Sequence, residues 1–174
     1  MARELVDQLS QSEIFTDLEK GCLACLAAIA TPASFKKGQQ IFSEGDQGDS
    51  FYQVTQGTVS ITKKDAAGTE REIAVLKEND ILGEMALLTD APRSAAAKCL
   101  TDVRLLRILR NDFQKQLKAG DAHSYQIILH LVGVLSKRLR EMNEQVSRLL
   151  QKQATKANPE LAALRERLTK EWSF

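Results

Sequence analysis

The sequence has few cysteines, prolines and aromatic residues, no excess of either charge and no long apolar run. Three cysteines are too few for a disulfide framework and fit a reducing cytoplasm. A formal net charge of +1 gives no electrostatic reason to expect binding to nucleic acid or to an anionic membrane. No apolar run approaches the ~20 residues of a membrane span, and the charged start MARELVDQLSQSE is unlike a signal peptide. The 174 residues therefore predict a cytoplasmic protein with one domain, or with one domain and an appendage.

The middle of the chain, residues 33–120, has the pattern of a small antiparallel β structure. Short apolar runs recur there, over Gln40–Phe42, Phe51–Thr55, Val59–Thr62, Ile73–Leu76 and Val103–Ile108. Turn signals built on glycine separate them about every ten residues. This pattern predicts an α+β fold whose centre is an antiparallel β-roll, similar to a jelly-roll barrel.

Helical spacing of apolar residues flanks this region on both sides. Residues 1–32 predict a helical lead-in. Asn111 is expected to cap a short helix over Asp112–Lys118, which Gly120 ends. Residues 121–157 predict one long helix, and a proline restarts a short helix within 158–174.

Seven apolar positions of the long helix alternate four and three residues apart. They are Ile128, Val132, Leu135, Leu139, Met142, Val146 and Leu149. Such a heptad seam is typical of helices that pair with one another. It predicts a homodimer formed through this helix, and the alternative is that the stripe packs on the chain's own β-roll.

The segment with a chemical signature is ILGEMALLTDAPRSAA, residues 81–96, which we call the cassette. Gly83 permits close backbone approach, and the short helix that begins there offers N–H groups and its positive dipole end to an anion. Arg93 would add a bidentate guanidinium and Ser94 a hydroxyl donor. Glu84 can accept a hydrogen bond from a neighbouring hydroxyl. This set fits a phosphorylated sugar, although a lone Glu and Arg at this spacing more often form a structural ion pair.

The cassette and its surroundings resemble the cyclic-nucleotide-binding domain shared by the bacterial catabolite activator protein, the regulatory subunits of cAMP-dependent protein kinase and cyclic-nucleotide-gated channels. The similarity runs from Phe35 to Arg140. It includes IFSEGD at 41–46, FYQV at 51–54, GTV at 57–59, the whole cassette and LSKRL at 135–139. Two residues depart from the family: Leu82 stands where many members have an aromatic, and Asn79 replaces a glycine at a position where asparagine tolerates left-handed backbone.

This resemblance implies a role for each residue of the site. Arg93 pairs with the exocyclic oxygens of a cyclic phosphate, assisted by Ser94. Glu84 accepts a hydrogen bond from the ribose 2′-hydroxyl, and the backbone N–H groups of Met85 and Ala86 meet the phosphate. A serine after the arginine favours cAMP over cGMP, although its hydroxyl would also serve guanine.

The long helix carries one further candidate residue. Asn143 aligns with a position that reaches the purine edge in dimers of the family, and the alternative is an ordinary solvated helix asparagine. Regulation would require the helices after the β-roll to respond to the ligand. The resemblance thus implies a cyclic-nucleotide sensor without a further cofactor or metal, acting on an unknown effector protein or on another part of a longer chain.

Three other function classes remain as alternatives. A transcription factor would need a DNA-reading module after the long helix, and residues 158–174 are too few, so no direct DNA binding is expected. A redox or iron–sulfur sensor would use Cys22, Cys25 and Cys99, but relatives with such a cluster use four cysteines, and buried structural thiols fit better. An enzyme is not expected, because His123 and His130 have no matching carboxylate or cysteine.

Overall fold

The computed structural model describes residues 2–153 and 167. The chain divides into two compact units, the first ending at His130 and the second beginning at Leu131. The first unit contains all the strands found among the described residues, and it contains the cassette. One helix, α5 (Ala122–Gln153), begins in the first unit and continues into the second.

Helices precede the strands, as the sequence predicts. They are α1 (Ala2–Ser10), the short 3₁₀ helix η1 (Glu13–Phe15) and α2 (Lys20–Ile29). Leu9, Phe15 and Leu26 are fully buried, and the ring of Phe15 contacts that of Phe51 in the β-roll. Gln53 also ties α1 to the roll, because its amide nitrogen donates to the carbonyl oxygen of Gln8 at 2.7 Å.

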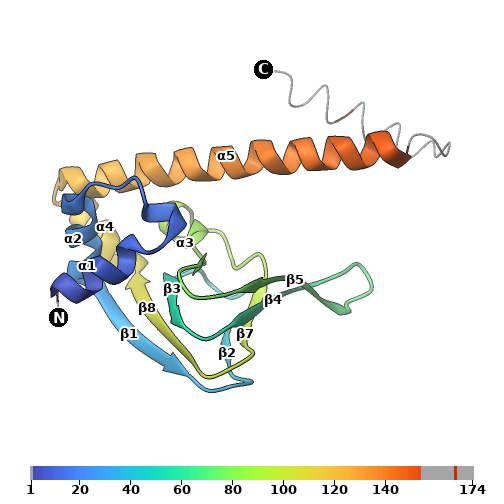
Figure 1. Ribbon diagram of the computed structural model, residues 1–174, viewed down its shortest axis with the longest axis horizontal. Helices are drawn as coiled ribbons and strands as arrows, with labels where there is room; N and C mark the ends of the chain where they lie inside the picture. The colour runs from blue at the N-terminus through green and yellow to red at the C-terminus, as the bar shows by residue number, and fades with distance from the viewer. Residues whose placement is uncertain (1, 154–166, 168–174) are drawn as a thin grey trace. The chain divides into compact units, whose positions relative to one another are not determined.

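The described strands form two antiparallel sheets of four strands each (Figure 1). The first sheet has the order β1 (Ala30–Phe35), β8 (Val103–Leu109), β3 (Ser50–Gln56) and β6 (Ile81–Leu82). The second has the order β2 (Gln40–Phe42), β7 (Ala96–Cys99), β4 (Val59–Lys64) and β5 (Glu70–Leu76). Consecutive strands β4 and β5 form a hairpin that extends beyond their neighbours (Figure 1).

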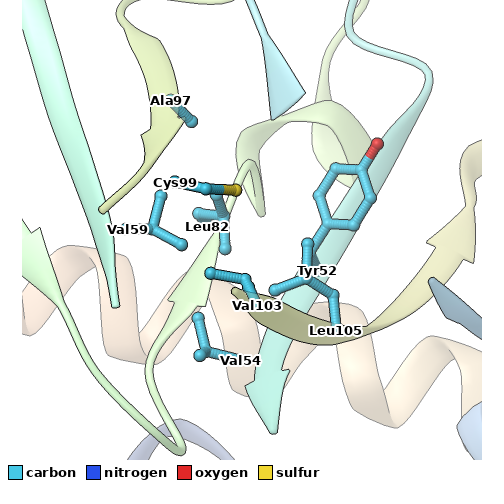
Figure 2. Packing of buried hydrophobic residues seen from close by; sticks show 8 residues of the cluster. All are labelled: Tyr52, Val54, Val59, Leu82, Ala97, Cys99, Val103 and Leu105. Carbon is cyan, nitrogen blue, oxygen red and sulfur yellow. The ribbon is translucent and has the colours of Figure 1, made fainter. Parts of the chain in front are cut away.

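Side chains from both sheets meet in one apolar core. Figure 2 shows eight of them, contributed by β3, β6 and β8 of the first sheet and by β4 and β7 of the second. The period of two along each strand explains the selection, since every second residue faces inward. Val54, Val59 and Ala97 are completely inaccessible to solvent. The predicted fold class, an antiparallel β-roll with flanking helices and a long C-terminal helix, is confirmed.

Five of the eight strands coincide with the apolar runs in the sequence, and three do not. β1 contains Pro32 and lies at a sheet edge, where a missing N–H is tolerated. β7 has the sequence AAKC, whose alanines favour helix over strand when considered alone. β6 is only two residues long.

The helix after β8 starts earlier than the sequence predicts. α4 (Arg110–Lys118) follows directly from Leu109, which is extended and makes no side-chain cap. The prediction that Asn111 caps this helix is therefore wrong, because β8 continues into α4 without a polar loop. Gly120, with φ +77°, follows the end of α4 as predicted.

Along α5, several predicted seam residues are accessible to solvent. Val132, Leu139 and Met142 are exposed by 48, 39 and 56%. Ile128, in contrast, is half-buried, and its neighbour Leu129 is 72% exposed. The end of the predicted long helix, residues 154–157, and the predicted helix within 158–174 lie outside the described residues apart from Arg167.

Among residues 2–153 and 167, no helix combines the length and the apolar character that a membrane span needs.

Candidate functional site

The cassette connects the two sheets through a four-residue helix. β6 ends at Leu82, and α3 (Met85–Leu88) follows after Gly83 and Glu84. Gly83 has a φ of +76°, and a Cβ there would overlap Nη1 of Arg93. Arg93 is thus a close neighbour of Gly83, and the predicted approach of an anion to the Gly83 backbone stays a prediction. The first N–H groups of an α-helix have no acceptor within the helix, and here they belong to the start of α3.

Arg93 is the buried cation of this region, with only 6% of its surface exposed. Its Nη2 donates to the carbonyl oxygen of Ser50 at 2.6 Å, and its Nη1 donates to that of Gly83 at 3.3 Å. The Arg93 backbone is held as well, because its N–H donates to the carbonyl of Asp46 and its carbonyl accepts from the N–H of Gly45, both at 2.8 Å. These hydrogen bonds hold both the backbone and the guanidinium of Arg93 in place.

The guanidinium of Arg93 carries its charge with little compensation. The nearest carboxylate contact is Oδ1 of Asp49, 3.7 Å from Nη2. Oδ2 of that carboxylate lies closer to Arg107, at 2.9 Å from Nη2. Burial lowers the pKa of Arg93 from its usual range, but an arginine stays protonated in proteins. Its Nε is buried and has no hydrogen-bond partner among the described residues.

A cavity of about 330 Å³ opens beside this guanidinium. Its polar wall contains Glu84, Arg93 and Ser94 from the cassette. Its apolar wall comes from four strands or their ends, with Phe42, Ile61, Ile73, Leu76 and Leu82. Small-molecule sites commonly measure about 300–1,000 Å³ and combine an apolar lining with a few polar groups. A small ligand with one anionic group therefore suits this cavity.

The structure brings most of the predicted site residues to one place. Gly83, Glu84, Met85, Arg93 and Ser94 all line the cavity. Glu84 is half-buried at the N-cap position of α3, Met85 is 49% exposed, and Ser94 is exposed. The backbone of Ala86 follows in the first turn of α3. Asn143 is half-buried on α5 in the second unit, so its predicted role stays a prediction.

The sequence reasoning did not assign three of the groups that surround Arg93. They are the Ser50 carbonyl, the Asp49 carboxylate and the ring of Phe42, whose centre lies 4.2 Å from Cζ of Arg93. The turn signal at Gly48 and Asp49 predicts a loop, but it does not predict which segment of the chain this loop contacts. The bridge between Gln47 and Pro92, together with the backbone hydrogen bonds of Gly45 and Asp46 to Arg93, brings this loop beside the cassette.

Cys22 and Cys25 belong to α2, and Cys99 of β7 packs in the core cluster that also contains Leu82 of the cassette. Cys22 and Cys99 are buried and Cys25 is half-buried. Burial raises the pKa of each of these thiols, which makes them poor nucleophiles. Within residues 2–153 and 167, no three His, Cys, Asp or Glu side chains gather as a metal site.

The comparison with protein families agrees with this geometry. A profile described as the cyclic nucleotide-binding domain matches residues 32–119, just over half of the chain.

The chain belongs to the cyclic nucleotide-binding domain family.

Proteins similar to this family member are regulators. The CRP-like cAMP-activated global transcriptional regulator of Mycobacterium tuberculosis is 29% identical over 142 residues, which are 82% of this chain and 62% of the regulator. The cAMP-dependent protein kinase regulatory subunit of Yarrowia lipolytica is 34% identical over 63% of this chain and 28% of its own length. The chain thus spans less than two thirds of each of these curated relatives.

A solved structure also has this cyclic nucleotide-binding fold. The N-terminal domain of a transcriptional regulator from Streptomyces coelicolor superimposes with a TM-score of 0.65 at 29% identity. The match covers 80% of this chain and 94% of that domain. The similarity therefore extends beyond the cassette to the helices around the β-roll.

Proposed function

We propose that this chain is a cyclic-nucleotide sensor that prefers cAMP to cGMP and passes ligand occupancy on through α4 and α5. The observation that carries the proposal is the buried, positively charged Arg93 at the wall of a mainly apolar cavity. A buried charge without a close counter-ion is costly. A phosphate in the cavity would supply that counter-ion.

Each cassette residue has a role in this proposal. Arg93 pairs with the exocyclic oxygens of the cyclic phosphate, and Ser94 adds a hydroxyl donor. The N–H groups of Met85 and Ala86 donate to the phosphate from the first turn of α3. Glu84 accepts a hydrogen bond from the ribose 2′-hydroxyl. The apolar strands then surround the base.

The preference for cAMP is supported by two observations. Ser94 occupies the position where a threonine tends to accompany cGMP in the family. The similar proteins from M. tuberculosis and Y. lipolytica are named for cAMP. Asn143 keeps its predicted role at the purine edge, where its amide offers both a donor and an acceptor.

Contacts between the cassette and α4 support the transmission of occupancy. Asp90, two residues beyond α3, forms an ion pair with Arg110, the first residue of α4. The backbone N–H of Arg110 also donates to the carbonyl oxygen of Asp49 at 2.8 Å. A ligand that repositions the cassette would therefore act directly on the start of α4.

The exposed apolar residues of α5 support a homodimer formed through this helix. The effector that reads the signal is a separate protein or another part of a longer chain. The fold and the relatives are those of regulatory proteins, and the proposal includes no catalysis by this chain.

Thermal unfolding in the presence of candidate ligands tests the ligand class directly. A ligand that binds only the folded state raises the melting temperature with its concentration. We expect the largest shift for cAMP, a smaller one for cGMP, and none for AMP or cyclic dinucleotides. Equal shifts for AMP and cAMP would show that the cyclic phosphate is not recognised, and the absence of any shift would refute the proposal.

The Arg93→Ala variant tests the site. Removing one partner of a buried charged pair costs about 2–5 kcal/mol, so we expect the affinity for cAMP to fall by at least about thirtyfold in isothermal titration. Arg71→Ala is the matched control, because Arg71 is an exposed arginine of β5 that pairs with Asp65 at 2.8 Å. Circular dichroism establishes that both variants fold. An unchanged affinity in Arg93→Ala would contradict the assignment.

A further inference from the structure

The guanidinium of Arg93 lies against an aromatic ring that is itself stacked on a second ring. Its Cζ lies 4.2 Å from the centre of the Phe42 ring. That ring stacks on Tyr52, with centres 6.2 Å apart and planes inclined by 24°. Arg107 lies over the ring of Tyr52, with its Cζ 5.9 Å from the centre of that ring. Both guanidiniums also contact the carboxylate of Asp49, so the two cations and the two rings form a compact cluster.

The residues of this stack come from separate parts of the fold. Phe42 ends β2 of the second sheet, while Tyr52 and Arg107 are paired neighbours on β3 and β8 of the first. Tyr52 is only 4% exposed and belongs to the apolar core. The Phe42 ring, against which Arg93 lies, is therefore packed on a buried residue of the core.

An aromatic face compensates a buried cation in a particular way. The ring quadrupole attracts the guanidinium through the face of its plane, and this attraction is strongest where water is excluded. A guanidinium is planar and weakly hydrated, so it stacks well on a ring. A carboxylate in contact would instead accept hydrogen bonds from the guanidinium N–H groups. The ring stabilises the charge and leaves those donors available to an anion.

The surroundings of Arg93 are consistent with a ring that stabilises the charge and an anion that accepts the hydrogen bonds. Asp49, the nearest carboxylate, lies closer to Arg107 than to Arg93, at 2.9 against 3.7 Å. Nε of Arg93 has no partner among the described residues. The cation that faces the cavity is thus held by a ring and two backbone carbonyls.

We propose that Phe42 is a positioning residue for anion recognition: its ring orients the Arg93 guanidinium and keeps its N–H donors directed at the phosphate site. The proposal deepens the proposed function and rests on it. It assigns an energetic role to an apolar residue that otherwise belongs only to the cavity wall.

Nuclear magnetic resonance tests the stack without any ligand. A proton above an aromatic face is shielded, so the side-chain Nε–H proton of Arg93 is expected upfield of those of exposed arginines. The Arg93→Lys spectrum identifies the signal by its loss. The upfield shift should vanish in Phe42→Leu and remain in Phe42→Tyr. A shift that persists in Phe42→Leu would overturn the proposal.

Affinity provides the second test. We expect Phe42→Leu to weaken cAMP binding roughly ten- to thirtyfold, and Phe42→Tyr to stay within about threefold of the original protein. Phe35→Leu is the matched control, since Phe35 packs against the same core but does not line this cavity. It should leave the affinity unchanged.

The outcomes separate this proposal from the one on which it rests. If the unmodified protein binds no cyclic nucleotide, the proposed function fails, while the resonance of Arg93 still reports on the stack. If it binds and Phe42→Leu binds equally well, only the role of Phe42 is refuted. An equal loss in Phe35→Leu would also refute it, because general packing would then explain the effect. Should Phe42→Leu fail to fold, Phe42→Met removes the ring and retains more volume.

Discussion

The residue that leaves room for the Arg93 guanidinium is Gly83. Its backbone has a φ of +76°, and an added Cβ would overlap Nη1 of Arg93 and lie 3.2 Å from the carbonyl oxygen of Ser50. Both neighbours are tightly held, one as a buried cation and the other as backbone. The glycine is therefore required by its surroundings as well as by its own conformation.

Gly83→Ala is expected to lower stability and to displace Arg93. An alanine at positive φ destabilises by at least about 1 kcal/mol, and the overlap adds to this loss. Gly68→Ala is the matched control, because Gly68 has a φ of +79° but no atom within 4 Å of an added Cβ. Urea unfolding and cAMP titration of both variants measure the difference. Equal stability losses, with cAMP affinity retained in Gly83→Ala, would show that the contact with Arg93 is unimportant.

At the scale of single residues, the sequence predicted features that depend on a residue and its neighbours along the chain, such as backbone conformation. Asn79 has a φ of 73°, as expected for an asparagine in the place of a glycine. The partner of Arg93 at Ser50 was not predicted, because it lies 43 residues away and only sheet pairing brings it near. A single sequence contains no local signal for such a contact.

The first turn of α5 depends on one acidic side chain. Asp121 Oδ2 accepts from the N–H and from the hydroxyl of Ser124, both at 2.7 Å, and from the thiol of Cys25 at 3.2 Å. The hydrogen bonds from Ser124 are the main reason why the pKa of Asp121 is lowered from 3.8 to about 2. Its charged form is thus the one that holds the helix start.

This depressed pKa predicts how stability depends on acid. A group whose pKa is lower in the folded state stabilises the fold above its unfolded value, near 3.8, and loses that effect as the pH falls towards about 2. Asp121→Asn keeps an acceptor but cannot titrate, so its stability should fall less between pH 4 and pH 2. Urea unfolding across this range, with the exposed Glu13→Gln as control, measures the effect. Identical acid profiles for Asp121→Asn and the original protein would contradict it.

The start of α4 is expected to respond to the ligand through Asp90. We predict that cAMP changes hydrogen exchange in the first turn of α4, and that Asp90→Asn reduces this change, because the ion pair with Arg110 is lost. Asp112→Asn is the control, since it removes an exposed pair with Lys115 within α4 itself. Exchange followed by mass spectrometry would contradict the prediction if both variants responded like the original protein.

Elements with a clear period were predictable, whereas their pairing was not. The alternation of apolar and polar residues predicts strand β4, and the heptad spacing of apolar residues predicts helix α5. The neighbours β2 and β7 pair Gln40 with Lys98, and β1 and β8 pair Phe35 with Val103. Such partners are separated by most of the domain, and the small alanines of β7 give no strand signal. The spacing of apolar residues predicted only the individual helices and strands, and the resemblance to a family predicted how they are arranged.

At the scale of the whole molecule, the exposed apolar residues of α5 call for a partner. Val132, Leu139 and Met142 are spaced by seven and three residues, and each is at least 39% exposed. Single exposed apolar residues are common on protein surfaces, but a continuous row with this spacing is typical of paired helices. The row also avoids the charged neighbours Lys137 and Glu141, which are exposed beside it.

We therefore expect a homodimer at concentrations on the order of tens of micromolar, measured by light scattering. The double variant Val132→Glu, Leu139→Glu would place like charges in the seam of both helices, so it should be monomeric. Lys137→Glu is the control, because it changes charge outside the seam and should leave the dimer intact. Cyclic AMP should still bind to the monomeric variant, since the cassette lies in the other compact unit. A monomer in the original protein, with and without cAMP, would refute dimerisation and would leave this row as the surface for a different partner.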